Sequence, residues 1–262
     1  MKNLSKYNSW ALVTGASDGI GKDFATQLAK EGFSLYLVAR GTEKLERVQN
    51  ELKSKFGVQV RISAQDISKT KSVESLLEET KDIQFGIIVL SAGFGSGGAF
   101  ESLPLDNELN MIDLNCRSVV QMSNAFIQKA VGKSNLGLIV FGSLLGFQGV
   151  PWSSTYAATK AFVQSFAEGL YGEYKGKGID VLSVAPGPVA TGFGGRASLK
   201  MGMSQSPEGI AKEALSALGK TDTIRPGFLS KFLGYSLATA PRKIRSMILK
   251  QIMASMINNG KK

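Results

Sequence analysis

The sequence contains no histidine and a single cysteine, Cys116, among 262 residues. Without histidine the chain cannot build a Ser-His-Asp hydrolase, a Cys-His protease or a histidine-ligated metal site. One cysteine is too few for a structural zinc site or an intrachain disulfide, so we expect no bound metal. Any proton carrier must therefore be a tyrosine, lysine, aspartate or glutamate.

Long apolar runs are absent as well. The longest, such as residues 87–90 and 136–141, are far shorter than the roughly 20 residues that a membrane-spanning helix needs. The first nine residues lack the apolar core of a signal peptide. Together with the single cysteine, these absences predict a cytoplasmic protein.

Acidic residues are outnumbered, which gives the chain a formal net charge of +10. Such a charge favours anionic partners, but the basic and aromatic patterns of nucleic-acid-binding modules are missing, so we expect no nucleic acid partner. The charge is uneven, because residues 225–262 hold eight Lys and Arg and no Asp or Glu.

What the sequence does contain is a regular alternation of strand and helix patterns. Strands are predicted over residues 10–13, 35–39, 58–64, 85–90, 138–141 and 180–185, and helices over 19–32, 43–56, 73–80, 106–130 and 153–175. We therefore predict an α/β protein with a single-domain Rossmann fold over residues 1–225. Its sheet would be doubly wound and mostly parallel, with about seven strands and helices on both faces.

Glycine-rich segments follow the strands, at residues 15–21, 93–98, 142–149 and 187–195. In a doubly wound sheet the ligand lies outside the carboxyl ends of the strands, where these segments would gather. Residues 191–206 show no clear periodicity, and we interpret them as a mobile lid over that edge.

The first glycine-rich segment, residues 14–21, reads TGASDGIG. Its glycines would let the backbone approach a pyrophosphate at the N-terminus of the next helix, although a plain glycine-rich turn is the alternative. The second strand then ends in Ala39 and Arg40 rather than in an acid. Because an arginine there accommodates a 2′-phosphate, NADP(H) is the predicted cofactor, unless Arg40 is only a surface charge.

Two Tyr-x-x-x-Lys pairs occur, Tyr156 with Lys160 and Tyr171 with Lys175. Residues four apart share one face of a helix, so either lysine could lie beside its tyrosine. Tyr156 begins its helix beyond the sheet edge and follows Ser143, whereas Tyr171 lies about 22 Å further along the helix axis. We assign the reactive pair to Tyr156 and Lys160, and we place the other pair at the surface or an interface.

Hydride transfer to a carbonyl group leaves negative charge on its oxygen and needs a nearby acid. Tyr156 would donate that proton, and Ser143 would orient the substrate oxygen. A free phenol has a pKa of about 10, and the Lys160 ammonium would lower it by stabilising the phenolate. The predicted reaction is hydride transfer between nicotinamide and a carbonyl or secondary alcohol.

From Trp10 to about Arg225 the chain resembles the short-chain dehydrogenase/reductase family. The resemblance rests on TGASDGIG, on Ser91-Ala92-Gly93, on Asn115, on Ser143 with Tyr156 and Lys160, and on PGPVAT at residues 186–191. The catalytic residues would then be Asn115, Ser143, Tyr156 and Lys160. The cofactor-binding residues would be Gly15, Ser17, Asp18, Gly19, Ile20, Gly21, Arg40, Asp66, Ile67, Ala92, Gly93, Tyr156, Lys160, Pro186, Gly187, Val189 and Thr191.

The family resemblance also implies individual roles. Lys160 would bind the nicotinamide ribose, Asn115 would support a proton-relay water, and Thr191 would contact the nicotinamide amide. Asp66 and Ile67 would meet the adenine. The family and the long predicted helices further imply a homodimer or homotetramer.

Two positions depart from the family pattern. Ser91 replaces the usual asparagine, and we expect the fold to tolerate this change. Asp18 stands where some NADP-binding members have a basic residue, which leaves Arg40, with Ser17, to hold the 2′-phosphate.

Beyond residue 225 the resemblance fades, and residues 226–262 are predicted to form a basic amphipathic extension of the same domain. Its apolar residues at helical spacing include Ile244, Met247, Ile248, Ile252 and Met256. This helix could pack on the domain, close the substrate pocket or pair subunits. The alternative is reversible attachment to an anionic membrane, which would make the protein peripheral.

The substrate is the least specified part of the prediction. The first 70 residues resemble 3-oxoacyl and hydroxysteroid reductases of this family, so a lipid-like ketone is favoured. Residues 94–103, 144–152 and 193–203 would supply an apolar and aromatic pocket, with no obvious anchor for a substrate carboxylate beyond Arg196 and Lys200. Two other functions are weighed: a catalytically silent NADPH-binding scaffold, and a membrane-surface module in which the fold is a passenger.

Overall fold

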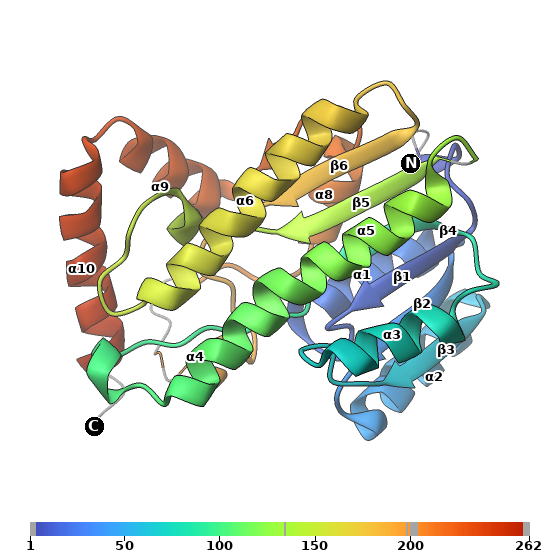
Figure 1. Ribbon diagram of the computed structural model, residues 1–262, viewed down its shortest axis with the longest axis horizontal. Coiled ribbons are helices and arrows are strands. Elements are labelled where there is room, and N and C mark those ends of the chain that lie inside the picture. The colour runs from blue at the N-terminus through green and yellow to red at the C-terminus, as the bar shows by residue number, and fades with distance from the viewer. Residues whose placement is uncertain (1–3, 134, 198, 200–203, 259–262) are drawn as a thin grey trace.

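The computed structural model describes residues 4–133, 135–197, 199 and 204–258. Its centre is a parallel sheet of seven strands in the order β3-β2-β1-β4-β5-β6-β7 (Figure 1). The strands are β1 (Trp10–Thr14), β2 (Ser34–Ala39), β3 (Val60–Ala64), β4 (Phe85–Leu90), β5 (Leu136–Phe141), β6 (Ile179–Val184) and β7 (Thr223–Ile224). The predicted doubly wound α/β fold is confirmed.

Helices cover both faces of this sheet (Figure 1). They are α1 (Gly19–Lys30), α2 (Thr42–Phe56), α3 (Thr70–Glu79), α4 (Leu105–Ile112), α5 (Ser118–Ala130), α6 (Ser154–Tyr174), α7 (Phe193–Arg196), α8 (Ile210–Ala217), α9 (Phe228–Ala238) and α10 (Arg242–Asn258). Successive strand residues point to opposite faces, so Ala11 and Val13 join one core with α1, α2 and α8. Leu12 joins the other core with α3, α5 and α6.

The strand order reverses at β1, which pairs with β2 on one side and with β4 on the other. The chain crosses to opposite faces on the two sides of this point, so the loops after β1 and β4 separate there. Such a crevice at the carboxyl edge is where doubly wound sheets bind ligands. The glycine-rich segments that follow β1, β4 and β5 all reach this edge.

The helix predicted over residues 106–130 is interrupted. A π-helical turn, Asp113–Arg117, separates α4 from α5 and contains Asn115. A π-turn inserts one residue into the helical repeat and re-aims the side chains within it, and such turns are frequent at functional sites. Periodicity alone could not reveal this insertion, because the apolar pattern continues on both sides.

The segment predicted as a mobile lid, residues 191–206, contains regular structure in its described part. It includes the short helix α7, and Ala197 and Leu199 within it are buried. A parallel bridge joins Val189 to Gln205 at its far end. Apolar burial and backbone pairing therefore hold the described residues of this segment against the domain.

The C-terminal region forms two helices rather than the single one predicted. Figure 1 shows α9 and α10 together at the end of the molecule opposite β3 and α2. Leu249 and Met253 of α10 are buried in a small third cluster with Ala197 and Leu199. Among the described helices, none is both long enough and apolar enough to cross a membrane.

Gly21 provides a test of how tightly the start of α1 packs. A Cβ atom on Gly21 would lie 2.3 Å from the Gly15 carbonyl oxygen and 2.8 Å from Ser91 Oγ. Because the first of these is backbone, Gly21→Ala forces the loop to shift, and we expect it to lower the free energy of unfolding by about 3 kcal/mol. Equilibrium urea unfolding measures the change.

Gly172→Ala is the matched control, because Gly172 also lies in a helix but has open space around its Cα. That change should raise the free energy of unfolding by about 0.5–1 kcal/mol, since alanine is the better helix former. Equal effects of the two substitutions would contradict the close packing at Gly21.

Candidate active site

A cavity of about 690 Å³ lies along the carboxyl edge of the sheet. It extends from Arg40 and Asp66, beyond β2 and β3, to Tyr156 at the start of α6. The predicted site residues all line it except Asn115 and Lys160. Predicted site residues from position 15 to position 191 of the sequence thus line one cavity in the folded chain.

The loop between β1 and α1 is shaped by its glycines. Gly15 and Gly19 have φ of +67° and +54°, in the left-handed region that favours glycine. A Cβ atom on Gly19 would also lie 2.7 Å from the methyl group of Thr191. Asp18 caps α1, because its Oδ1 accepts a hydrogen bond from the Gly19 N–H at 2.7 Å. This cap gives Asp18 a local structural role at a position where a basic residue could have stood.

Ser91, which departs from the family pattern, is integrated into the loop network. Its hydroxyl donates a hydrogen bond to the Thr14 carbonyl oxygen. In return, Thr14 Oγ1 accepts a bond from the Ala92 N–H at 3.1 Å. These two bonds join the ends of β1 and β4 across the crevice, so serine serves here as a connector between the two loops.

Two exposed cations stand at the mouth of the cavity, where β2 ends and α2 begins. One is Arg40, as predicted, and the other is Lys44, which the sequence analysis did not assign. Its position in the first turn of α2, four residues after Arg40, was a signal in the sequence. Both side chains can reach an anionic group in this part of the cavity.

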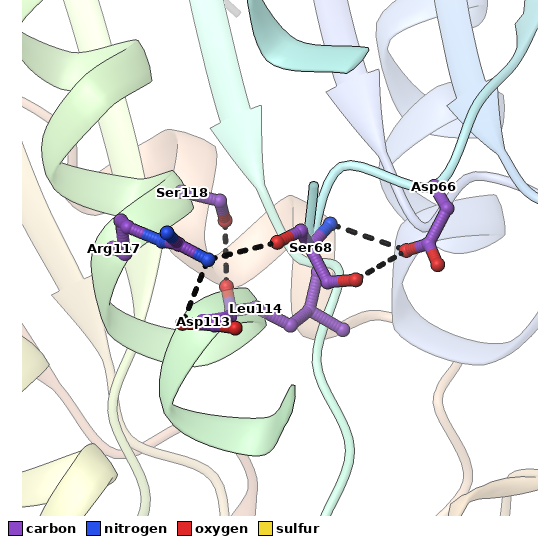
Figure 2. Close-up of polar contacts among 6 residues, drawn as sticks. All are labelled: Asp66, Ser68, Asp113, Leu114, Arg117 and Ser118. Atoms are coloured by element: carbon purple, nitrogen blue, oxygen red, sulfur yellow. Dashed lines mark hydrogen bonds and ion pairs between the residues drawn. The ribbon is translucent and has the colours of Figure 1, made fainter. Parts of the chain in front are cut away.

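Figure 2 shows how the Asp66 loop is fixed. Asp66 Oδ1 accepts hydrogen bonds from the Ser68 N–H at 3.1 Å and from Ser68 Oγ at 2.8 Å. Arg117 donates to the Ser68 carbonyl oxygen at 3.4 Å and forms an ion pair with Asp113 at 2.8 Å. These contacts tie the loop after β3 to the π-turn that holds Asn115.

Asn115 lies behind the cavity wall and is 1% exposed. Its Nδ2 donates to the Phe94 carbonyl oxygen at 2.9 Å and to Thr159 Oγ1 at 3.0 Å. Its Oδ1 accepts from the Phe94 N–H at 3.2 Å and would lie 2.9 Å from a Cβ atom on Gly93. The amide therefore joins the loop after β4 to α6, and the absence of a side chain at Gly93 makes room for it.

Tyr156 and Ser143 meet in the wall of the cavity. Ser143 follows β5, and its Oγ accepts a hydrogen bond from the Leu145 N–H at 3.2 Å. Burial of the Tyr156 hydroxyl raises its pKa to about 12. A hydrogen bond with Ser143 acts in the opposite direction but is the smaller effect. The Tyr156 ring also contacts Phe193 of α7, with 5.3 Å between ring centroids.

Lys160 is 7% exposed and donates a hydrogen bond to the Phe141 carbonyl oxygen at 2.8 Å. Its Nζ lies 5.7 Å from the centroid of the Tyr156 ring, and burial lowers the pKa of the ammonium to about 8. The expectation that Lys160 lowers the pKa of Tyr156 is wrong for this structure. The ammonium is directed at a backbone carbonyl, and desolvation dominates at the phenol.

The second pair, Tyr171 and Lys175, has the same internal geometry, with Lys175 Nζ 5.5 Å from the Tyr171 ring centroid. Neither residue lines the cavity, and Lys175 is exposed. Local spacing therefore does not distinguish the two pairs; their position relative to the sheet edge does.

The segment after β6 connects the cavity to α9. The Gly187 N–H donates to Ser230 Oγ at 2.7 Å, and Ser230 is fully buried. The Thr191 hydroxyl accepts a hydrogen bond from the Phe193 N–H at 3.2 Å, at the start of α7. The PGPVAT segment thus positions both helices that border the cavity on this side.

Comparison with known proteins agrees with this geometry. A family model described as short chain dehydrogenase matches residues 9–201. The chain belongs to the short-chain dehydrogenase family. Among its relatives, human very-long-chain 3-oxoacyl-CoA reductase is 32% identical over 250 residues, which are 94% of this chain and 80% of that protein.

Solved structures resemble this short-chain dehydrogenase over most of its length. A short-chain dehydrogenase from Sphingobium yanoikuyae, in complex with NADPH, has a TM-score of 0.79 at 26% identity and is matched over 93% of its chain, with 88% of this chain covered. A 7β-hydroxysteroid dehydrogenase has a TM-score of 0.86 at 24% identity, with 94% and 98% of the two chains covered, and shows the shared fold. The chain is therefore an oxidoreductase, rather than a silent scaffold or a membrane-surface module.

The far wall of the cavity in this short-chain dehydrogenase is apolar. Its residues from α9 and α10 are Leu233, Leu237, Leu249, Ile252, Met253 and Met256. The inner face of α10 closes the substrate pocket, which was one of the arrangements predicted for this helix. Lys200 and the side chain of Arg196 lie outside the described part of the chain. The spacing of Leu249, Met253 and Met256 predicts a helix, but the surface that it covers is decided by tertiary packing.

The buried ammonium predicts an unusual pH dependence for the cofactor-free protein. Lys160 has a folded-state pKa of about 8 against 10.5 for the free side chain. Between these values the unfolded chain binds the extra proton, so stability rises with pH. Relative to Lys160→Met, the wild type should gain roughly 2 kcal/mol in free energy of unfolding from pH 8 to pH 10, measured by urea unfolding at each pH.

Lys175→Met is the control, because that lysine is exposed. Its free energy of unfolding should follow the wild type in parallel over the same range. A difference between wild type and Lys160→Met that stays constant from pH 8 to pH 10 would mean that the folded state does not lower the pKa of Lys160.

Proposed function

We propose that this short-chain dehydrogenase interconverts an apolar ketone and its secondary alcohol, with NADP(H) as the hydride carrier. The observation that carries the proposal is one continuous cavity with two chemically different ends. At one end is a glycine-rich helix N-terminus flanked by Arg40 and Lys44. At the other, Tyr156 and Ser143 face an apolar wall.

The residues present fit a dinucleotide. Gly19 and Gly21 carry no side chains in the first turn of α1, so a pyrophosphate can approach the backbone N–H groups there. Arg40 and Lys44 would hold the 2′-phosphate, in keeping with the NADPH complex of the Sphingobium yanoikuyae relative. Ser17, Asp18, Ile20, Asp66, Ile67, Ala92, Gly93, Pro186, Gly187, Val189 and Thr191 would complete the cofactor site.

The proposed proton donor is Tyr156. When bound, the nicotinamide supplies a hydride to the carbonyl carbon, and negative charge then grows on the substrate oxygen. The Tyr156 hydroxyl, with a pKa of about 12, stays protonated at neutral pH and donates its proton to that oxygen. Ser143 would hold the oxygen by a hydrogen bond. The products are a secondary alcohol and the oxidised cofactor.

Lys160 and Asn115 would act next to this pair. The Lys160 Nζ lies 5.7 Å from the centroid of the Tyr156 ring and donates its hydrogen bond to the Phe141 carbonyl oxygen, which fixes the start of α6 beside the end of β5. Lys160 would also bind the nicotinamide ribose, since its Nζ lies 3.6 Å from the place of a Cβ atom on Gly93, which lines the cavity. Asn115 would support a relay water while it holds the loop at Phe94. Thr191 would contact the nicotinamide amide.

The apolar wall favours a lipid-like substrate, of the 3-oxoacyl or steroid type. Leu237, Leu249 and Met253 offer it contact area, and neither α9 nor α10 contains an acidic residue. The human relative named as a very-long-chain 3-oxoacyl-CoA reductase supports a substrate with a long apolar part. Burial of each methylene would add about 0.8 kcal/mol to binding, so affinity should rise with chain length.

We also propose a homodimer or homotetramer in the reducing cytoplasm. Val120 of α5 and Phe162 of α6 are large apolar side chains left exposed, and Phe162 stacks on Phe166 at 6.0 Å. Apolar helix faces of this kind are typical of subunit contacts. Cys116 is a free thiol whose pKa burial raises to about 11, which suits a compartment without disulfides.

Replacement of Tyr156 by phenylalanine tests the chemistry. Tyr156→Phe removes the proton donor and keeps the ring, so kcat for NADPH oxidation with an active ketone should fall by about a thousandfold. The dissociation constant for NADPH should stay close to that of the wild type. NADPH absorbance measures the first, and quenching of protein fluorescence the second.

Tyr171→Phe is the matched control, since it changes the other Tyr-x-x-x-Lys pair, which lies away from the cavity. Its kcat should equal that of the wild type. Wild-type turnover by Tyr156→Phe would refute the proposed acid.

Arg40→Asp tests the cofactor preference. The change removes a cation beside the proposed 2′-phosphate and adds an acid that can bind a free ribose hydroxyl. The ratio of kcat/KM with NADPH to kcat/KM with NADH should fall at least about tenfold, the loss of one charge-assisted contact.

Arg47→Asp makes the same change of charge on α2, at a side chain that is 78% exposed and does not line the cavity. It should leave the ratio unchanged. If Arg47→Asp lowers the ratio as much as Arg40→Asp does, the effect is one of general charge and Arg40 does not discriminate between the cofactors.

A further inference from the structure

The outer faces of α9 and α10 carry large apolar side chains in contact with solvent. On α9, Phe228, Phe232 and Tyr235 are 84%, 59% and 65% exposed. Their spacing of four and three residues places them on one side of the helix, and the first two rings stack at 6.2 Å. We call these three residues the aromatic ridge.

The helix α10 continues this surface. Its exposed apolar residues away from the cavity are Ile244, Met247 and Ile248. Both helices lie at one end of the molecule (Figure 1). Monomeric proteins seldom leave so many large apolar side chains exposed in one region unless a partner covers them.

The charged side chains of α9 and α10 are all of one sign. The segment 228–258 holds five Lys and Arg and no Asp or Glu. Lys243 and Lys250 are exposed beside the apolar residues of α10, and Lys231 forms an ion pair with Glu213 at 2.6 Å. The Arg225 guanidinium lies 5.7 Å from the ring of Tyr235, at the edge of the aromatic ridge. Aromatic and apolar groups flanked by cations match the headgroup region of an anionic bilayer.

A second copy of this chain fits the surface less well. Self-association through α9 and α10 would bring two acid-free, cation-rich helix pairs together, and like charges repel. An anionic lipid surface supplies both an apolar phase for the aromatic ridge and a negative charge for the lysines.

The opposite faces of the same helices line the cavity, through Leu233 and Leu237 of α9 and Leu249 and Met253 of α10. One helix pair therefore separates the apolar end of the active site from the outer apolar surface. We propose that α9 and α10 dock this protein on an anionic lipid bilayer, so that an apolar substrate passes from the lipid into the cavity between them. The docking stands by itself, and the passage of substrate rests on the proposed function.

Vesicle co-sedimentation of the full-length protein tests the docking. The protein should pellet with vesicles of phosphatidylcholine containing about 30% phosphatidylserine, and much less with phosphatidylcholine alone. Phe228→Ser/Phe232→Ser should lower the partition coefficient about tenfold or more, because two rings no longer enter the lipid. Lys243→Gln/Lys250→Gln should lower it by a similar factor on the anionic vesicles.

Lys53→Gln/Lys55→Gln is the matched control for charge, since these exposed lysines lie on α2 at the other end of the molecule (Figure 1). Val131→Ser, at a side chain that is 49% exposed after α5, is the control for apolar loss. Both controls should pellet like the wild type.

Each of three results would overturn the docking. The first is wild-type protein that stays in the supernatant, and the second is an aromatic-ridge variant that pellets as well as the wild type. The third is a change in the oligomeric state of Phe228→Ser/Phe232→Ser in the absence of vesicles, which would identify the surface as a contact between copies of the chain.

Activity separates docking from chemistry. With a water-soluble ketone, Phe228→Ser/Phe232→Ser should keep the kcat/KM of the wild type, which also shows that the variant is folded. With a long-chain ketone embedded in anionic vesicles, its rate should fall about tenfold, in proportion to the lost partitioning. Equal rates on the embedded ketone would refute entry from the lipid. Failure of the Tyr156 chemistry would leave the sedimentation result unaffected.

Discussion

Lys160 holds a charged group almost out of reach of solvent, and its hydrogen bond to the Phe141 carbonyl oxygen joins α6 to the end of β5. Desolvation of an ammonium costs several kcal/mol, so its hydrogen-bond partner constrains how the two elements pack. Tyr156 lies one helical turn before this contact, and Ser143 follows Phe141 by two residues. The hydrogen bond from Lys160 to Phe141 thus compensates the buried ammonium and also positions the Tyr156 and Ser143 hydroxyls in the cavity wall.

The rest of the site is joined to this point by polar contacts. Asn115 bonds both to the loop at Phe94 and to Thr159, the neighbour of Lys160. Arg117, in the same π-turn, reaches the Ser68 carbonyl beside Asp66 (Figure 2). A displacement of the π-turn would therefore shift residues at both ends of the cavity. This connection gives the irregular turn a physical role that a regular helix would not supply.

The C-terminal helices combine two surfaces of different solvent exposure. Ser230 holds α9 to the loop at Gly187, and Leu249 and Met253 seat α10 over the cavity. Their other faces remain apolar and basic in water. The same two helices therefore line the cavity on one side and expose apolar side chains to solvent on the other.

Much of this protein could be predicted from sequence because its signals are local. Strand and helix periodicity determines the sheet, the glycines at 15, 19 and 21 determine the loop, and the position of Tyr156 at the start of its helix separates it from Tyr171. Tertiary structure alone decided that Lys160 bonds to Phe141 rather than lowering the pKa of Tyr156, that a π-turn carries Asn115, and that α9 and α10 complete the cavity. These outcomes depend on contacts between residues far apart in the chain and on the desolvation that those contacts create, and neither can be read from spacing.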